Sequence, residues 1–320
     1  MRLICAAFTV SARVATPYPP RRVRNKSTRP WTIYSRLGRT IRTTPWHMQA
    51  WPPAKNGWTV FAVAGDRREL FEQWRAHALK ALQLDDSLAE AHQALAWVLF
   101  IYDWKFAESE KEFRRAIELN PNGEAHLPYA VLLTSLGRLE ESKVEFERAL
   151  QLDPLTIAVK SNAAATYNCA GDYEHAASLA QASLARVASR VQLGIARIEQ
   201  GVTEEGIAEL RRAAEISKND PFFVTYLAWA YRRSGKHVEA VRLLEEAKSR
   251  SRDKPILPEY LAAFYAAVGD NEHALQWLHM AVEEHSITFV LPLNRCDRRF
   301  EKLRGDPRFA DLLRRIGLPP

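Results

Sequence analysis

Apolar and small residues recur along this chain at helical spacing and also in a longer repeat. Five glycines, separated by 34, 30, 34 and 34 residues, mark the longer repeat; they are Gly137, Gly171, Gly201, Gly235 and Gly269. Seven or eight positions before each glycine stands an apolar residue followed by a very small one, and twelve positions after each stands alanine or serine. A period in this range predicts a stack of helix pairs.

The residue sizes explain how one such pair would form. Antiparallel helices approach closely only where side chains are small, and Ala164, Ala176 and Ser183 supply such positions in one unit. A glycine ends the first helix because the left-handed conformation costs it nothing. Leu119-Asn120-Pro121 and Leu152-Asp153-Pro154 end second helices, since proline cannot continue them. One pair leaves an apolar face bare, so neighbouring pairs must stack.

These residues carry a family resemblance. Ala116–Pro121 and Ala149–Pro154, with the early Leu/Tyr-Ala pairs and the glycines, resemble the tetratricopeptide repeat. The resemblance implies an all-α, right-handed superhelical solenoid of about six helix pairs from Ala89 to about His285, preceded by a helix at Arg67–Leu84. Two units depart from the pattern. Tyr102-Asp103-Trp104 stands where the first glycine is expected, and the fourth unit is shortened by four residues, with Gly206 in place of alanine. We expect looser packing around Gly206.

The pattern ends after His285, where Ile287–Leu293 has the composition of an extended segment. Asp306-Pro307 then predicts the start of an amphipathic helix that would cover the open face of the last pair. The run from Phe300 to Leu318 is similar to the C-terminal tetratricopeptide arms of bacterial signalling proteins, which follow winged-helix regulators, nucleotide cyclases or protein kinases. That resemblance does not extend to the first 60 residues, so we expect their effector domain to be lacking. We therefore expect three parts: a basic, disordered tail at 1–65, a solenoid at 66–286 and a capping segment at 287–320.

The net charge of +7 is unevenly distributed. Residues 1–60 hold eleven Arg or Lys and no Asp or Glu, whereas the rest of the chain holds 34 basic and 38 acidic residues. Three interpretations of the basic tail stay open: a targeting segment, a disordered arm that touches nucleic acid or an anionic surface, or a stretch with no fold or role of its own. The second would act through four basic residues, Arg21, Arg22, Arg24 and Lys26. We expect a cytoplasmic protein, or an exported one if residues 1–20 act in targeting.

Catalytic and metal-binding motifs are missing from the sequence. It contains no HExxH, no GxSxG and no paired metal-ligand spacing, so we expect no enzyme activity, no metal and no cofactor. His92 and His126 stand at equivalent positions of consecutive units, where packing is the simpler role. Cys5, Cys169 and Cys296 lie far apart, which favours free thiols over a disulfide. No run approaches the ~20 apolar residues of a membrane span.

The resemblance implies that the first helix of each pair lines a concave groove for another protein. Carried over position by position, it gives the candidate groove residues Gln93, Trp97, Phe100, Leu127, Val131, Asn168, Ile195, Trp229, Arg232 and Glu259. This wall is mostly apolar, so it suits an amphipathic helix or an apolar extended peptide better than an acidic tail. Trp97 and Trp229 would anchor the ligand, or would simply pack on the next helix. The hypothesis is a non-catalytic scaffold. The alternative is the regulatory arm of a transcriptional regulator or signalling protein that contacts DNA or another anionic partner through its basic tail.

Overall fold

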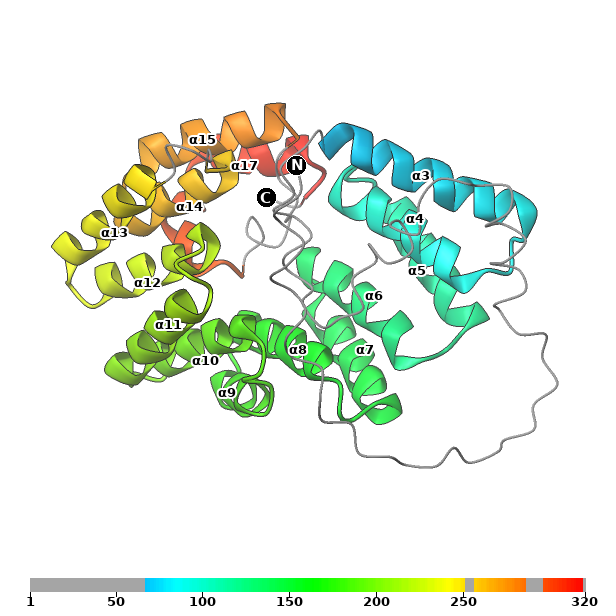
Figure 1. Cartoon of the computed structure of the whole chain (residues 1–320), viewed down its shortest axis with the longest axis horizontal. Coiled ribbons are helices and arrows are strands. Elements are labelled where there is room, and N and C mark those ends of the chain that lie inside the picture. The colour runs from blue at the N-terminus through cyan, green and yellow to red at the C-terminus, as the bar shows by residue number, and fades with distance from the viewer. Residues whose placement is uncertain (1–66, 251–255, 286–295, 319–320) are drawn as a thin grey trace, which may run out of the picture. The chain divides into compact units, whose positions relative to one another are not determined.

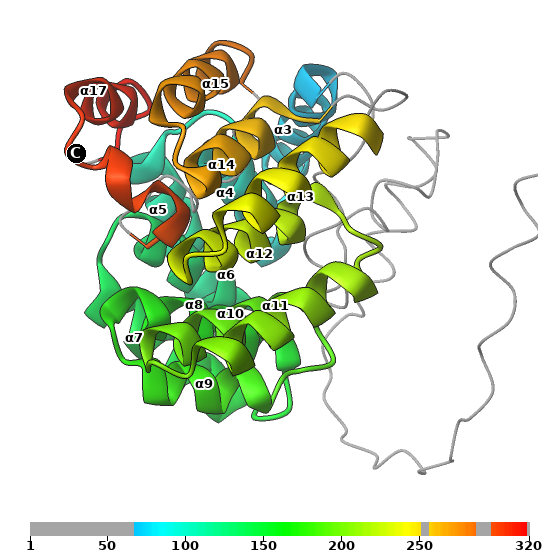
Figure 2. The ribbon, with the colours of Figure 1, turned by 90° about the vertical axis from the view of Figure 1, so that its left-hand side faces the viewer.

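A computed structural model describes residues 67–250, 256–285 and 296–318, all of them within the second of two units, Pro52–Pro320. The described residues form helices and no strand, and consecutive helices lie side by side in pairs (Figures 1 and 2). In chain order these are α3 (Arg67–Leu84), α4 (Ala89–Ile101), α5 (Phe106–Leu119), α6 (Gly123–Ser135), α7 (Leu139–Leu152), α8 (Ile157–Ala170), α9 (Tyr173–Gln181), α10 (Val187–Glu199), α11 (Thr203–Ile216), α12 (Pro221–Arg233), α13 (His237–Arg250), α14 (Pro258–Val268), α15 (Asn271–Glu283), the 3-10 helix η2 (Arg298–Leu303) and α17 (Pro307–Arg315). The all-α solenoid predicted from the sequence is confirmed, with six pairs from α4/α5 to α14/α15.

Each repeat glycine separates the two helices of its pair. All five adopt φ between +75° and +86°, a left-handed conformation that is strained for residues with a Cβ. In the first pair Trp104 stands between the helices instead, with φ +56°. The expected departure at Tyr102-Asp103-Trp104 therefore keeps the left-handed turn and changes only the residue that makes it.

Small residues fill the contacts between helices, as the sequence pattern predicts. Ala130, Ala164 and Ala228 in first helices are completely buried, and so are Ala149 and other alanines of the second helices. A methyl group lets two helix backbones approach without a void, and interiors are packed to crystal-like density. The repeated alanines thus set the distance between helices in every pair.

The shortened fourth unit, α10/α11, corrects one expectation. Gly194 and Gly206 face each other at the crossing of the two helices, and a Cβ added to Gly206 would lie 2.6 Å from the Gly194 carbonyl oxygen and 2.5 Å from Ile198 Cγ1. No room for a methyl group exists there. The prediction of looser packing around Gly206 is wrong, because the missing side chains let the two backbones move closer together.

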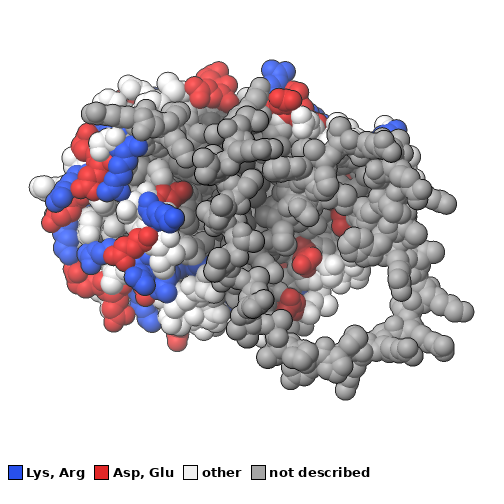
Figure 3. All heavy atoms as spheres, viewed as in Figure 1, with Lys and Arg blue, Asp and Glu red and all other residues white. Residues whose placement is uncertain are grey.

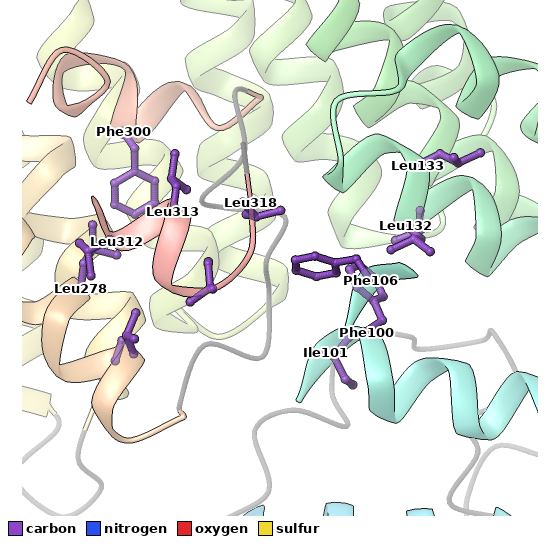
Figure 4. Packing of buried hydrophobic residues seen from close by; sticks show 14 of the residues in the cluster. Phe100, Ile101, Phe106, Leu132, Leu133, Leu278, Phe300, Leu312, Leu313 and Leu318 are labelled. Carbon is purple, nitrogen blue, oxygen red and sulfur yellow. The ribbon is translucent and has the colours of Figure 1, made fainter. Parts of the chain in front are cut away.

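The C-terminal segment extends the array and then meets its beginning. Asp306 accepts a hydrogen bond from Arg308 N and caps α17, which packs on α15 as predicted. Beyond α17, Leu318 shares a buried cluster with Phe106 of the first pair, and the two side chains point toward each other (Figure 4). His285, after α15, stacks on Trp104 with ring centroids 4.7 Å apart. The cap therefore covers the last pair and also contacts the first.

Hydrogen bonds to a single carboxylate join the first two helix pairs. Glu110 of α5 accepts from Arg138 at 2.7 Å, from Tyr129 at 2.9 Å and from Arg114 at 2.8 Å. Burial alone would raise the pKa of Glu110, but the hydrogen bonds from Arg138 and Tyr129 outweigh it and hold that pKa below its ordinary value. The carboxylate therefore stabilises the contact between the first two pairs in its ionised form.

Lys and Arg atoms alternate with Asp and Glu atoms on the visible face around α11 to α13 (Figure 3). Ion pairs also join neighbouring helix pairs, among them Arg233 with Glu199 at 3.0 Å and Lys236 with Glu204 at 2.8 Å. The predicted basic tail, the candidate contacts Arg21, Arg22, Arg24 and Lys26, and the extended segment Ile287–Leu293 all lie outside the described residues. The interpretations of these segments stay predictions.

Candidate binding groove

A small cavity lies against the first helices of the middle pairs. Its volume is about 80 Å³, and its wall includes Val131 of α6, Asn168 of α8 and Ile195 of α10, three of the residues predicted for the groove. Tyr226 of α12 and residues 296–298 close its other sides. The structure therefore brings together side chains from four successive first helices, as a shared inner wall requires.

Polar side chains line this cavity together with apolar ones. The Asn168 side chain, 5% exposed, donates from Nδ2 to the Gln192 carbonyl oxygen at 2.9 Å and to Gln192 Oε1 at 3.0 Å. Its Oδ1 is buried and finds no hydrogen-bond donor among the described residues. A buried acceptor without a donor is costly. Asn168 therefore carries an unmet hydrogen-bond acceptor on a residue that lines the cavity.

The remaining predicted groove residues do not line this cavity. Trp97 is partly buried and packs on Phe100 and Phe113, with ring centroids 5.7 and 5.8 Å away. Trp229 is only 6% exposed and belongs to the core, with the Arg233 guanidinium 5.8 Å from its ring centre. Both tryptophans thus pack within the array. The others lie elsewhere along it: Gln93 donates to the Glu124 carbonyl oxygen, Arg232 donates to the Val268 carbonyl oxygen, Glu259 is buried, and Leu127 packs against the core.

The cysteines correct a second expectation. Cys169, at the end of α8, and Cys296, just before η2, form a disulfide across a sequence separation of 127 residues. The prediction of free thiols at these two positions is wrong. Spacing along the sequence carried no signal, because the two cysteines are far apart along the chain. They lie together because the C-terminal segment returns to α8.

The returning segment places a charged pair inside the array. Arg299 of η2 is 3% exposed; its guanidinium donates to Asp297 at 2.6 to 3.2 Å and to the Thr225 hydroxyl of α12. The guanidinium carbon lies 3.8 Å above the centre of the Tyr226 ring and 5.6 Å from that of Phe222. These residues carry no signal in the repeat pattern, since the C-terminal segment is predicted only to cap the last pair.

Burial opposes ionisation of Arg299, but the Asp297 carboxylate outweighs it and raises the pKa of Arg299 above its ordinary value. Burial also opposes ionisation of Tyr226, which for a phenol means a raised pKa, so Tyr226 stays neutral at any physiological pH. The pair is therefore an ionised arginine on a neutral aromatic ring, held by a carboxylate from its own segment.

The histidines that sequence analysis considered for metal binding pair with carboxylates instead. His92 Nδ1 lies 2.5 Å from Glu112 Oε2, and His126 Nδ1 lies 2.6 Å from Glu145 Oε2, in each case on the second helix of the same pair. Within residues 67–250, 256–285 and 296–318, no three His, Cys, Asp or Glu side chains gather as metal ligands would. No helix in those ranges combines the length and the apolar character needed to cross a membrane.

Comparison with known proteins agrees with this architecture. The family model described as tetratricopeptide repeat matches residues 124–154, which comprise α6 and α7 almost entirely. No curated protein matches the sequence significantly.

Two solved structures illustrate the likeness in fold. A tetratricopeptide repeat protein from Parabacteroides merdae is 14% identical, with a TM-score of 0.53 over 77% of this chain and 98% of the other. Human IFIT1, solved as a dimer with m7Gppp-AAAA, is 20% identical, with a TM-score of 0.55 over 77% of this chain and 60% of the other. Arrays of this kind serve in general as scaffolds that contact other proteins. With its glycine-separated pairs, its alanine contacts and the matching repeat at 124–154, the described part of the chain has the fold of a tetratricopeptide repeat array.

Proposed function

We propose that this protein is a non-catalytic scaffold that binds a segment of a partner protein along the inner wall formed by α6, α8, α10 and α12. The observation that carries the proposal is the buried Asn168 Oδ1, which has no donor among the described residues and belongs to a residue that lines the cavity together with the apolar Val131 and Ile195. A partner segment would supply a hydrogen-bond donor for this acceptor and apolar side chains to pack against the apolar lining residues.

An extended peptide fits these requirements in a specific way. Every residue of it except proline carries a backbone N–H donor, so one of these groups would satisfy Asn168 in most local sequences. Its apolar side chains would lie against Val131 and Ile195, which line the same cavity. Backbone hydrogen bonds would supply affinity, and the shape of the walls would select among side chains.

The test blocks the cavity without removing core residues. Ala165 of α8 lines the cavity and is only partly buried, whereas Gln181 at the end of α9 is exposed on a second helix. Both variants then carry the same tyrosine side chain, at a cavity-lining position in one case and at an exposed position in the other. We expect Ala165→Tyr to abolish capture of a specific partner, and Gln181→Tyr to leave capture within about 2-fold of wild type, since only the first fills the groove.

Quantitative affinity capture with the wild-type, Ala165→Tyr and Gln181→Tyr proteins measures this difference, with circular dichroism melting curves to verify folding. Every partner captured equally by the two variants would contradict the proposal. A partner lost from Ala165→Tyr alone would support it, and purification of that partner would then give the dissociation constant directly.

A further inference from the structure

Residues 296–303 lie across the array in the manner of a bound peptide. The segment reaches α8 through the disulfide, α9 and α10 through Arg298, and α12 through Arg299. The helix that follows is fixed separately, because Arg308 of α17 makes two hydrogen bonds to Glu272 of α15, at 2.7 and 2.8 Å. The contacts of Arg299 are therefore additional to those that hold the C-terminal cap.

The two sides of the Arg299 site differ in chemistry. The array contributes the Tyr226 ring at 3.8 Å, the Phe222 ring at 5.6 Å and the Thr225 hydroxyl as a hydrogen-bond acceptor. The carboxylate that neutralises the guanidinium is that of Asp297, two residues earlier on the same segment. The side chains that the array contributes are uncharged. The negative charge that compensates Arg299 lies on the same segment as Arg299 itself.

Such a site selects for the arginine side chain. A guanidinium stacks flat on an aromatic face and donates in several directions at once, whereas an ammonium is more strongly hydrated and does neither as well. An arginine buried here without an anion would be strongly disfavoured. The ligand that fits is accordingly an arginine preceded by an acidic residue two positions before it.

Resting on the function proposed above, we propose that Phe222, Thr225 and Tyr226 form an arginine-recognition subsite of the groove, filled here by Arg299, and that the partner segment carries an Asp-x-Arg sequence whose guanidinium takes the same place. The cavity at Asn168 adjoins this subsite, because Phe222 and Tyr226 line it together with Asn168, and residues 296–298 close its other sides. A partner that occupies both places would make contacts that residues 296–303 do not make.

The experiment uses the full-length chain with its internal ligand weakened by Cys296→Ser and Arg299→Ala. The probe is a fluorescein-labelled peptide with the sequence of residues 296–304 in which serine replaces the cysteine. Fluorescence anisotropy compares it with a peptide that has citrulline, a neutral isostere, at the position of Arg299. We expect citrulline to weaken binding at least about 10-fold, because the charge-assisted hydrogen bonds and the cation–π contact are lost. A peptide with alanine at the exposed position of Lys302 should bind within about 3-fold.

Variants of the array test the same contact from the other side. Tyr226→Phe keeps the aromatic face and should leave the preference for arginine over citrulline intact, whereas Tyr226→Leu should remove it. If the weakened chain does not fold, wild-type protein in reducing buffer with excess peptide gives the same comparison.

Equal binding of the arginine and citrulline peptides would overturn the proposal, and so would a lack of binding to both the weakened chain and the reduced wild-type protein. Concentration-dependent dimers in native mass spectrometry that dissociate on adding the probe would instead assign the site to a second copy of this chain. These failures are distinguishable from failure of the proposed function, because capture that depends on Ala165 can persist when the arginine preference is absent.

Discussion

Loss of the disulfide between Cys169 and Cys296 is expected to lower the free energy of unfolding substantially. The bond closes a loop with a sequence separation of 127 residues. In the chain-entropy model, a loop of that length removes roughly 16 cal/mol/K of entropy from the unfolded chain, which corresponds to about 5 kcal/mol at 25 °C. Replacement of either cysteine by serine should therefore cost up to this amount, and measured losses for native disulfides fall at about 2–5 kcal/mol.

Urea denaturation followed by circular dichroism measures the effect in Cys169→Ser, Cys296→Ser and the double variant. Both single substitutions remove the same bond. The free energy of unfolding of the double variant should therefore lie within about 0.5 kcal/mol of that of each single variant. Cys5→Ser is the matched control, because Cys5 takes no part in this bond. Losses below about 1 kcal/mol for both single variants, or losses that add in the double variant, would refute the reasoning, as would non-reducing peptide mapping that finds both thiols free.

Three further predictions concern packing and charge. Gly206→Ala should destabilise the protein by about 1–3 kcal/mol in urea denaturation, because its methyl group meets a backbone oxygen, whereas Gly305→Ala, with open space around it, should change stability by less than about 1 kcal/mol. Asp297→Asn should cost about 3–5 kcal/mol by the same assay, since it leaves Arg299 charged and buried without its anion; a loss below about 1 kcal/mol would contradict the burial of that pair. The lowered pKa of Glu110 implies a contribution to stability that is fully present above its ordinary pKa of 4.5 and is lost as the pH falls through its folded value, so Glu110→Gln should flatten the acid side of the stability profile; an unchanged profile would refute this.

Local features of the fold could be predicted from the sequence because they repeat. Each glycine needs only its own backbone conformation to end a helix, and each alanine needs only a helix at the expected distance, so Gly171 and Ala164 carry their structural meaning in their spacing. The Asp306 cap is equally local. Because the same pattern of small residues recurs at nearly fixed steps along the chain, the number of helix pairs could be predicted by counting the repeats.

Features that depend on distant parts of the chain could not be predicted in this way. The Cys169–Cys296 bond and the contact of Arg299 with Tyr226 require the C-terminal segment to return along the array, and no periodicity records that path. Gly206 was misjudged because its partner, Gly194, lies on the facing helix; one small residue suggests a gap, whereas two facing ones indicate close approach.

The candidate groove could be predicted only in part from the sequence. Val131, Asn168 and Ile195 could be predicted to share one face of the array, since register in a repeat fixes which face a residue occupies, and the three line one cavity. That this face binds a partner stays a prediction. The tryptophans could not be divided in advance between groove and core, because an aromatic side chain of that size reaches either a neighbouring helix or the open face from the same position.

Hydrogen–deuterium exchange on the protein with and without a purified partner tests the central claim most directly, because it reports which helices the partner covers. The account predicts slowed exchange in α8, α10 and α12, around Asn168 and Gln192, with little change in α9, α11 and α13. Slowed exchange confined to the second helices α9, α11 and α13, with the inner wall unaffected, would contradict it.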